Sequence, residues 1–360
     1  MSIYALSQRA GETCDAAGKA MQDVFAVLAQ KGSKTIWSMP KSCSKYMKIL
    51  DLPYLACFLL FRAGKKDSIF FAIPENHVKI KLVKAIKKVK KYQIICFIND
   101  LNAFRYGNAD DPIVQEKMRG EAQVIGMADV VLMPNTNTRE LLEKNGVTSR
   151  LIPVGIWDYL MTEQEQKQLK TAQEQKKCAV QQDTGTQPAK IAFAGNLNKS
   201  EFLKSIPFSK DMGLEMHLWG KLEDKKKEEL PPVCEYHGVL KAAEVPAAVC
   251  TMDYGLVWDG TGKDEIEGGL GEYLKYNNSH KCGLYLASGI PAIVWKRSGM
   301  AAFIKEHECG IVIERLSELP GKIKQADYEQ LKKNALLVSN QLQQGHYLKL
   351  ALEQALGEKK

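Results

Sequence analysis

Short apolar segments alternate with amphipathic helical patterns along most of this chain of 360 residues, and the alternation occurs twice. In the first half, apolar runs of strand length are separated by residues at the three- and four-residue spacing of amphipathic helices. This order predicts an α/β fold with a parallel sheet, because parallel strands need crossover connections. The predicted strands are residues 35–38, 68–73, 92–98, 129–133 and 149–152, and the predicted helices are residues 18–30, 79–91, 116–127 and 136–145.

The alternation stops at residues 161–188, which are almost wholly polar, and it starts again at residue 190. We interpret the polar segment as an exposed helix followed by a linker. The sequence thus predicts two α/β domains, residues 1–155 and 156–339, and a final helix at about 340–360 that we expect to pack back on the first domain. The second series of predicted strands comprises residues 190–194, 215–219, 234–237, 254–258, 292–295 and 310–313, and a helical region at 328–356 is broken at Gly345.

The bulk composition indicates a globular protein that stays inside the cell. Hydrophobic residues make up 45% of the chain, which is enough for two separate cores. The nine cysteines include no C-x-x-C pair, so neither a disulfide framework nor a zinc site is indicated. His217, His237 and His307 include no pair at metal-ligand spacing, so we expect structural or surface roles for them and no metal site. The first 15 residues lack a secretory signal pattern, and the apolar run 50–61 is too short to span a bilayer, so we expect a cytoplasmic protein in which this run is buried.

The net charge of +8 is concentrated partly in residues 79–91, KIKLVKAIKKVKK. Ile80, Val83, Ile86 and Val89 are three residues apart, so the segment predicts an amphipathic helix with lysines over its remaining surface. A solvated outer face on a core helix is the favoured interpretation, and peripheral contact with anionic head groups at the inner face of a membrane is the alternative. No recognisable reader motif accompanies the charge, so nucleic acid is not expected as a partner.

Residues 271–295 contain the most informative candidate site. They place polar and cationic side chains before a helical segment that is followed by a buried strand at 292–295. Lys281 lies at the expected start of this helix, where unpaired N–H groups and a partial positive charge favour a bound phosphate. An ordinary helix-to-strand connection explains the same residues equally well.

Glycines follow several predicted strands of the second half directly. Gly195 ends the run IAFAG, Gly220 and Gly238 occupy the same place after the next two strands, and residues 258–262 form a fourth, polar exit. A glycine at a strand exit lets backbone approach a ligand, and Lys199 could neutralise a phosphate there. A tight turn would also explain each glycine, but several exits toward one edge favour a shared ligand site at the carboxyl ends of the strands.

Two places in the first half are also candidates for chemistry. Asp100 follows the buried strand 92–98, where a general base could lie, although capping of a turn is an equal alternative for this carboxylate. Gly18 and Lys19 precede the opening helix at a predicted strand-to-helix exit, where backbone donors face outward.

Taken together, these residues resemble glycosyltransferases of the GT-B architecture, which are α/β proteins with two Rossmann-like domains facing each other across a cleft. The resemblance is carried by LIPVG at 151–155, FAGNLNKS at 193–200 and NNSHKCGLYLASGIPAIVW at 277–295. It is greatest to the bacterial branch that contains β-1,6-galactofuranosyltransferases and the glucosyltransferases that extend N-acetylglucosamine on serine-rich adhesins. It spans nearly the whole chain, and the order of the motifs is more specific than any one of them.

The resemblance implies a UDP-sugar donor, a saccharide acceptor and no requirement for a metal or other cofactor, because helix N-termini and basic side chains offset the charge of the leaving diphosphate. The chain departs from the family pattern at Leu284, where many retaining members carry a ribose-binding glutamate, so retention of configuration is not implied. The implied donor-binding residues are Gly195, Asn196, Lys199 and Lys281, with ribose contacts from Tyr254, Tyr276 or Asn277, with Gly18 and Lys19 near the donor sugar or the acceptor, and with Asp100 as the base of an inverting reaction.

The predicted function is transfer of a hexose, of the glucose or galactofuranose class, to a saccharide acceptor in surface polysaccharide or glycoprotein assembly. The acceptor could be lipid-linked or carried on a glycoprotein, and the sequence leaves a homo-oligomer open. Two alternatives share the same architecture: a non-catalytic UDP-binding partner subunit of another transferase, and an epimerase or hydrolase that acts on the UDP-sugar alone.

Overall fold

The chain forms two compact units, Met1–Gly155 together with Tyr347–Lys360, and Ile156–His346. The computed structural model describes residues 2–6, 16–36, 50–74, 77–182, 187–260, 262, 264–267 and 269–357. Residues 37 and 38, at the end of one predicted strand, lie outside the described residues.

The first unit contains a six-stranded parallel sheet with the strand order β2-β1-β3-β4-β5-β6. Every residue of β3 is buried, which is typical of a parallel strand that is covered on both faces. The strands are β1 (Ile3–Leu6), β2 (Lys34–Ile36), β3 (Ser68–Ile73), β4 (Gln93–Ile98), β5 (Val130–Met133) and β6 (Arg150–Pro153).

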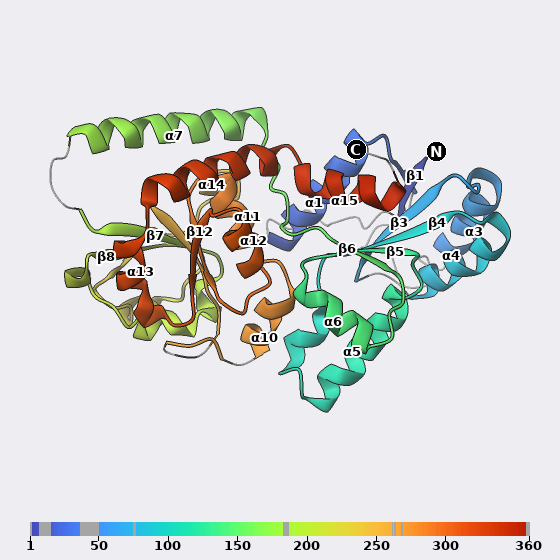
Figure 1. Cartoon of the computed structure of the whole chain (residues 1–360), viewed down its shortest axis with the longest axis horizontal. Coiled ribbons are helices and arrows are strands. Elements are labelled where there is room, and N and C mark those ends of the chain that lie inside the picture. The colour runs from blue at the N-terminus through green and yellow to red at the C-terminus, as the bar shows by residue number, and fades with distance from the viewer. Residues whose placement is uncertain are drawn as a thin grey trace. The chain divides into compact units, whose positions relative to one another are not determined.

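Helices cover both faces of the first sheet, with α1 and α15 above it in Figure 1 and α5 and α6 below. The last helix of the chain belongs to this unit: Lys31 Nζ lies 2.7 Å from Glu353 Oε1, and Gln93 Nε2 donates to the carbonyl oxygen of Ala355 at 3.1 Å. The helices are α1 (Ala16–Gln30), α3 (Asp51–Arg62), α4 (His77–Lys90), α5 (Pro112–Ile125), α6 (Asn137–Lys144) and α15 (His346–Leu356), with a 3₁₀ turn at Asn102–Tyr106.

Two features of the first unit differ from the sequence prediction. The four-residue strand β1, which lies between β2 and β3, is too short to give a recognisable period and is not predicted. The prediction that residues 50–61 are buried is wrong: they form most of α3, in which Leu55 and Leu59 are buried but Phe61 is 84% exposed. The apolar composition of this run hides the fact that only one stripe of the helix packs inward.

The second unit contains another six-stranded parallel sheet, with the strand order β12-β11-β10-β7-β8-β9. The chain runs outward from β7 through β8 and β9, then crosses to β10 on the other side of β7 and continues outward. Ligands bind parallel sheets at the carboxyl ends of the strands beside such a reversal, so the exits of β7 and β10 form the expected site. The strands are β7 (Ala189–Ala194), β8 (Leu214–Trp219), β9 (Cys234–Tyr236), β10 (Tyr254–Val257), β11 (Ala292–Trp295) and β12 (Gly310–Ile313).

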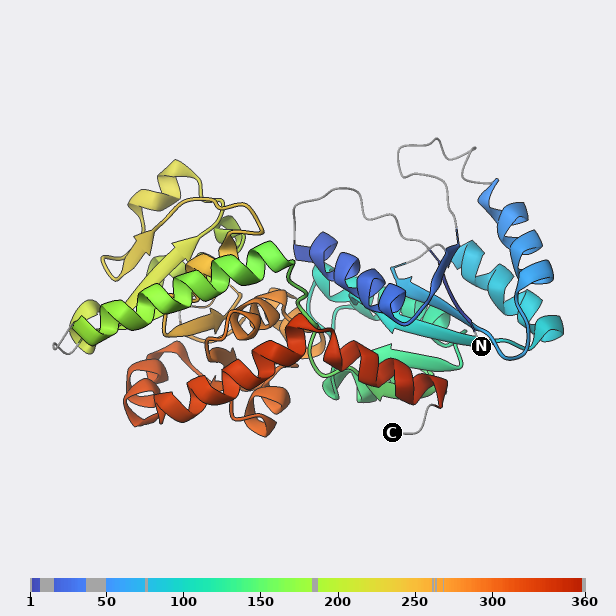
Figure 2. The same ribbon diagram turned by 90° about the horizontal axis from the view of Figure 1, so that it is seen from above.

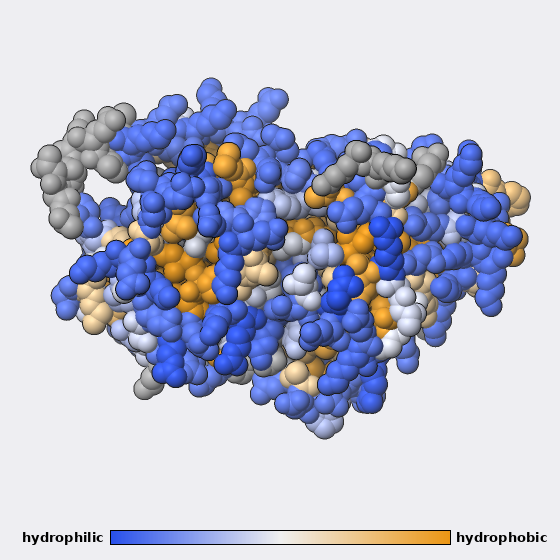
Figure 3. Space-filling model, viewed as in Figure 1, coloured by the Kyte–Doolittle hydropathy of each residue, from blue (hydrophilic) through white to orange (hydrophobic). Residues whose placement is uncertain are grey.

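Helices α7 and α14 lie over the same face of the second sheet (Figures 1 and 2). A capping box starts α7, because Glu165 Oε2 accepts the N–H of Thr162 at 2.7 Å and Thr162 Oγ1 accepts the N–H of Glu165 at 3.3 Å. Leu169 is the one buried residue of α7 in the range 163–177, and the surface over α7 in Figure 3 is hydrophilic. The prediction of an exposed polar helix is therefore confirmed.

The remaining helices of the second unit are short connections around the sheet. They are α7 (Glu163–Gln182), α8 (Asp224–Glu228), α9 (Val245–Val249), α10 (Gly269–Tyr276), α11 (His280–Ala287), α12 (Ala301–Glu306), α13 (Leu319–Gln325) and α14 (Tyr328–Gln343), with 3₁₀ turns at Leu197–Lys199, Glu201–Ser205, Lys210–Met212 and Leu316–Glu318. The two parallel sheets with their helices confirm the predicted α/β fold with two Rossmann-like domains. None of the helices in the described part of the chain has both the length and the apolar character that a membrane span requires.

Candidate functional site

Glycine residues form the backbone at the switch point of the second sheet, the place beside β7 where the strand order reverses. Gly195 follows β7 with a φ of 154°, and Gly220 follows β8 with a φ of 140°. The N–H of Gly195 donates to the carbonyl oxygen of Trp219 at 2.9 Å, and a Cβ on Gly220 would overlap the carbonyl oxygen of Gly195. Because no side chain fits at Gly220, the two strand exits touch through backbone, which leaves the edge open to a ligand.

Lys281 lies beside this backbone, in the first turn of α11. Its Nζ is 3.0 Å from Asp259 Oδ2 and 4.9 Å from the centroid of the Phe193 ring. A Cβ on Gly195 would lie 3.1 Å from the Cε of Lys281, so glycine also makes room for this side chain. Phe193 and Ala194 are the last two residues of β7, and Asp259 follows β10. The cation therefore lies between the ends of β7 and β10, where the strand order reverses.

Tyr285 fixes α11 against the same strands. Its hydroxyl accepts the N–H of Ala194 at 2.9 Å, and a Cβ on Gly255 would overlap its ring. Burial raises the pKa of Tyr285 above its usual range, so the hydroxyl keeps its proton. The sequence signals neither Tyr285, which has the helical spacing of a core residue, nor a specific role for Asp259, although it does mark residues 258–262 as a polar exit.

Four further predicted donor residues lie in the segments that adjoin this edge. Asn196 and Lys199 are exposed in the turn after Gly195, where Lys199 ends a 3₁₀ turn. Tyr276 ends α10, and the buried Asn277 follows it in the connection that leads into α11. The structure thus places these four residues near the chain segments that carry Gly195 and Lys281.

The structure places Tyr254, a predicted ribose contact, away from this edge. It is the first residue of β10 and pairs with Ile191, so it lies toward the amino end of the sheet. Its ring is 2% exposed and packs edge-to-face on Tyr328, with centroids 5.4 Å apart. About 13 Å of extended chain separate it from Trp258 at the strand exit, out of reach of a ligand at the carboxyl edge.

In the first unit, Asp100 follows β4 and is 8% exposed. The side chain of Glu121, on α5, is close enough to interact with its charge. Burial raises the pKa of Glu121 to about 7, with a smaller contribution in the same direction from the charge of Asp100 and an opposing one from the backbone N–H of Ala103. The structure thus brings together a carboxylate and a carboxyl group that keeps its proton near neutral pH, which is an arrangement suited to acid–base chemistry. The sequence gives no sign of Glu121, because it is one of several polar residues on an amphipathic helix.

Gly18 and Lys19 lie inside α1 and not before it, because the helix begins at Ala16. Lys19 Nζ lies 2.5 and 2.6 Å from the two carboxylate oxygens of Asp23, one turn further along the helix, and Asp23 is 6% exposed. The prediction that these two residues precede the helix is therefore wrong, whereas the predicted helix at 18–30 lies within α1 and ends at the same residue. Residues 7–15, which come before them, lie outside the described residues.

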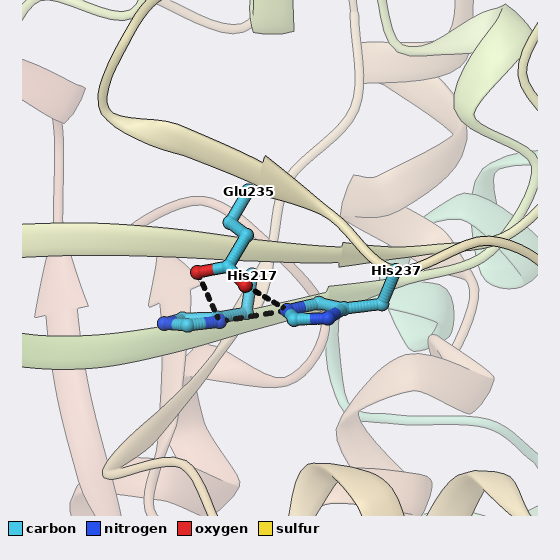
Figure 4. Close-up of side chains that lie close together, drawn as sticks. All are labelled: His217, Glu235 and His237. Carbon is cyan, nitrogen blue, oxygen red and sulfur yellow. Dashed lines mark hydrogen bonds and ion pairs between the residues drawn. The ribbon is translucent and has the colours of Figure 1, made fainter.

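Two histidines that the sequence pattern treats as unrelated are neighbours in the second sheet. His217 lies on β8, His237 directly follows β9, and the Nδ1 of His217 is 2.8 Å from the Nε2 of His237 (Figure 4). Burial lowers the pKa of His217, which favours its neutral form. Short-range spacing in the sequence cannot reveal this pair, because the strand register brings it together across a connection.

The fold is shared with solved structures across the whole chain. Anabaena HepE, solved in complex with UDP-glucose, is 11% identical in sequence, with a TM-score of 0.55 over 99% of this chain and 98% of that one. Together with the two Rossmann-like sheets, this likeness places the chain in the GT-B class of glycosyltransferase folds. The family described as "Glucosyltransferase 3-like, N-terminal domain" matches residues 3–156, and its "C-terminal domain" counterpart matches residues 191–355. The chain belongs to the glucosyltransferase 3-like family.

Curated relatives lie in the same branch, which confirms the resemblance inferred from the motifs. The chain is 22% identical to "Beta-1,6-galactofuranosyltransferase WbbI" of Escherichia coli (strain K12) over 351 residues, which cover 96% of both chains. It is 24% identical to "Glucosyltransferase 3" of Streptococcus gordonii over 278 residues, which cover 75% of this chain and 73% of that protein.

Proposed function

We propose that this protein transfers a hexose of the glucose or galactofuranose class from a UDP-sugar to a saccharide acceptor in surface polysaccharide or glycoprotein assembly. The observation that carries the proposal is the position of Lys281, a cation at the switch point of the second sheet beside glycine backbone. The names of the two curated relatives support a hexose, and the UDP-glucose bound to HepE supports a UDP-linked donor.

In this proposal the second unit binds the donor. The diphosphate displaces Asp259 from Lys281 and lies against the exit of β7 and the start of α11, with Lys199 as a second, exposed cation. As the bond from the sugar to the diphosphate breaks, negative charge develops on the leaving oxygen. The Nζ of Lys281 and the N–H groups at the start of α11 stabilise this charge, so the transfer step is proposed to need no metal.

The first unit is proposed to bind the acceptor. Asp100, at the carboxyl end of β4, accepts the proton of the acceptor hydroxyl as that oxygen attacks the sugar, which describes an inverting reaction. Its position directly after β4 and its burial, with 8% of the residue exposed, support this role. The acceptor is proposed to be lipid-linked or on a glycoprotein, with the enzyme in the cytoplasm at the inner face of a membrane, and the exposed lysines of α4 support such a location.

UDP release from a panel of UDP-sugars, with and without simple saccharide acceptors, tests the proposal. We expect release that increases with an acceptor and persists in the presence of a chelator. Lys281→Met should lower turnover by about 100-fold, because one charge-stabilising donor is worth that much in a transition state. Lys305→Met, at an exposed lysine of α12, is the matched control and should stay within about twofold of wild type.

The same assay separates the alternatives. UDP binding by calorimetry without release from any donor would favour a non-catalytic partner subunit, and turnover that needs no acceptor would favour an epimerase or hydrolase. Full activity of Asp100→Asn would exclude Asp100 as the base, and absence of UDP binding would exclude the donor site around Lys281.

A further inference from the structure

A cluster of three side chains on β8 and β9 has the composition of a metal-binding site. His217 and Glu235 are directly opposite each other in the parallel register of the two strands, and the N–H of His237 donates to the carbonyl oxygen of Leu218 at 2.9 Å. Figure 4 shows the carboxylate of Glu235 above the two imidazole rings, with its oxygens directed at both. All three side chains therefore meet at one place on the sheet.

The three potential ligand atoms form a triangle of suitable size. His217 Nδ1 lies 2.8 Å from His237 Nε2, while the carboxylate oxygens of Glu235 lie 3.7 Å from each of these nitrogens. Zinc bonds to nitrogen and oxygen ligands are about 2.0–2.2 Å long, which puts tetrahedral ligand atoms about 3.3 Å apart. Shifts of about half an ångström would bring the triangle to that spacing.

We propose that His217, Glu235 and His237 bind one Zn²⁺ ion, with water as the fourth ligand. Two imidazoles and one carboxylate suit zinc and its neighbours among the transition metals, whereas Mg²⁺ and Ca²⁺ prefer oxygen ligands alone. The site goes beyond the proposed transferase function and does not depend on it.

Binding needs only an internal transfer of one proton. Without metal, one ring donates its N–H to the other across the 2.8 Å contact. With metal, both of these nitrogens use their lone pairs for the ion, so the proton moves to the second nitrogen of the same ring and both imidazoles remain neutral. The Nε2 of His217 lies 3.8 Å from Glu215 Oε2, and this carboxylate can orient the ring as outer carboxylates do for metal-bound histidines.

Neighbouring aromatic contacts already hold the rings in place. The ring of Trp219 stacks on His237 at 4.7 Å between centroids, and the two imidazoles lie within 10° of parallel. Because the edge strand β9 has only three residues, a metal shared with β8 would secure it. The carbonyl oxygen of Trp219, at the end of β8, accepts the N–H of Gly195. A metal that holds β8 and β9 together would therefore also support the sheet edge that carries Lys281.

Zinc content of the full-length protein tests the site. The protein is stripped with a chelator, dialysed against buffered Zn²⁺ and subjected to elemental analysis, thermal unfolding and X-ray absorption spectroscopy. We expect one zinc per chain, a nitrogen and oxygen shell at about 2.0 Å, and a higher unfolding temperature with zinc than without. His237→Gln should weaken zinc binding by about 100-fold and Glu235→Gln by about tenfold. Both variants should fold without metal, since Glu235 is 60% exposed and His237 is 29% exposed.

The matched control is His307→Gln, which alters a histidine stacked on Phe303 in α12 of the same unit and should bind zinc as wild type does. Zinc binding that His237→Gln leaves intact would overturn the proposal, because the metal would then be held elsewhere. A sulfur shell at about 2.3 Å would also overturn it, as it would indicate cysteine ligands. Absence of bound zinc at a free Zn²⁺ concentration of about 10 μM would overturn it as well, because a dissociation constant above that concentration is too weak for a structural site.

Discussion

Glu121 shows how a single buried carboxyl group can make the stability of the first unit depend on pH. Its Oε2 atom has no hydrogen-bond partner within the described part of the chain. Burial, assisted by the charge of Asp100, raises the pKa of Glu121 from 4.5 to about 7, although the N–H of Ala103 opposes the shift. The folded protein therefore keeps a proton at pH values where the unfolded chain has released it.

We expect Glu121 to stabilise the protein fully below pH 4.5 and to lose this contribution as the pH rises through 7. Glu121→Gln, which mimics the protonated acid, should remove up to about 3 kcal/mol of pH dependence from the free energy of unfolding. Urea unfolding between pH 5 and pH 8, at steps of about one unit, measures the slope. Glu116→Gln, an exposed change on the same helix, should keep the wild-type slope. An unchanged slope in Glu121→Gln would contradict the expectation.

At the same scale, local patterns predict the position of some candidate residues and not of others. The places of Gly195 after a strand and of Lys281 at a helix start can be predicted, because both are signals within a few residues. Glu121 and the pair of His217 and His237 cannot, since their chemistry arises from packing between distant segments. Tyr254 is the first residue of its predicted strand, and the register places it at the amino end of β10, away from the strand exit.

Among the elements, α4 divides its lysines between structural and exposed positions. Lys79 Nζ lies 3.0 Å from Asp51 Oδ2, Lys84 Nζ donates to the carbonyl oxygen of Met127 at 2.9 Å, and Lys87 pairs with Asp129. These contacts hold α4 against the rest of the first unit, and they explain why these three lysines are half-buried. The exposed lysines of the segment are Lys81, Lys88 and Lys91, and Val89, predicted to face the core, is 74% exposed.

A membrane role for this surface must therefore depend on the three exposed lysines. We expect the protein to bind vesicles that contain anionic lipid at low salt and to leave them at high salt. Changing all three lysines to Gln should weaken binding by about 100-fold, at about 1 kcal/mol for each charge near the surface. Sedimentation with vesicles measures this.

The control for this experiment is an equal loss of charge on the second unit, at the exposed Lys225, Lys305 and Lys333. This triple change to Gln should leave vesicle binding within about twofold of wild type. An equal loss in both triple variants would mean that net charge alone drives binding, and no vesicle binding by the wild type would remove the membrane contact from the proposal.

The predictability of elements follows from how sharply their ends are marked. Strands β3, β11 and β12 have the predicted bounds, because each is a continuous apolar run between polar or turn-forming residues. The break at Gly345 is also predicted correctly. Its φ of 72° lies in the left-handed region, which glycine adopts without steric cost, and this conformation ends α14. In contrast, β1 and the exposed face of α3 depend on neighbours that lie far away in sequence.

For the whole molecule, the two compact units are linked by a chain that passes between them twice, after Gly155 and after His346. The last helix, α15, completes the first unit although α14 before it belongs to the second. It contributes buried Leu348 and Leu352, and Leu352 is 0% exposed. A repeating strand–helix pattern predicts the number of such units. The last helix is expected from the sequence to pack back on the first domain, and its contacts with Lys31 and Gln93 described above lie in that unit.

We expect Leu352→Ala to destabilise the first unit by about 2–4 kcal/mol, the cost of a cavity left by a buried leucine. Four of the five tryptophans (Trp157, Trp219, Trp258 and Trp295) belong to the second unit and Trp37 belongs to the first, so tryptophan fluorescence reports chiefly on the second unit, while far-ultraviolet circular dichroism reports on both. Urea unfolding of this variant should show an earlier phase by circular dichroism and an unchanged midpoint by fluorescence.

The control variant is Leu337→Ala on α14, where the side chain is 60% exposed and both signals should remain as in wild type. If Leu352→Ala instead shifts both signals together, the two units unfold as one cooperative system and the first does not lose structure alone. If it shifts neither, α15 contributes little to the first unit, and the burial of Leu352 would not translate into stability. The predicted separation of the two signals arises because the cavity lies in the first unit, whereas four of the five tryptophans belong to the second.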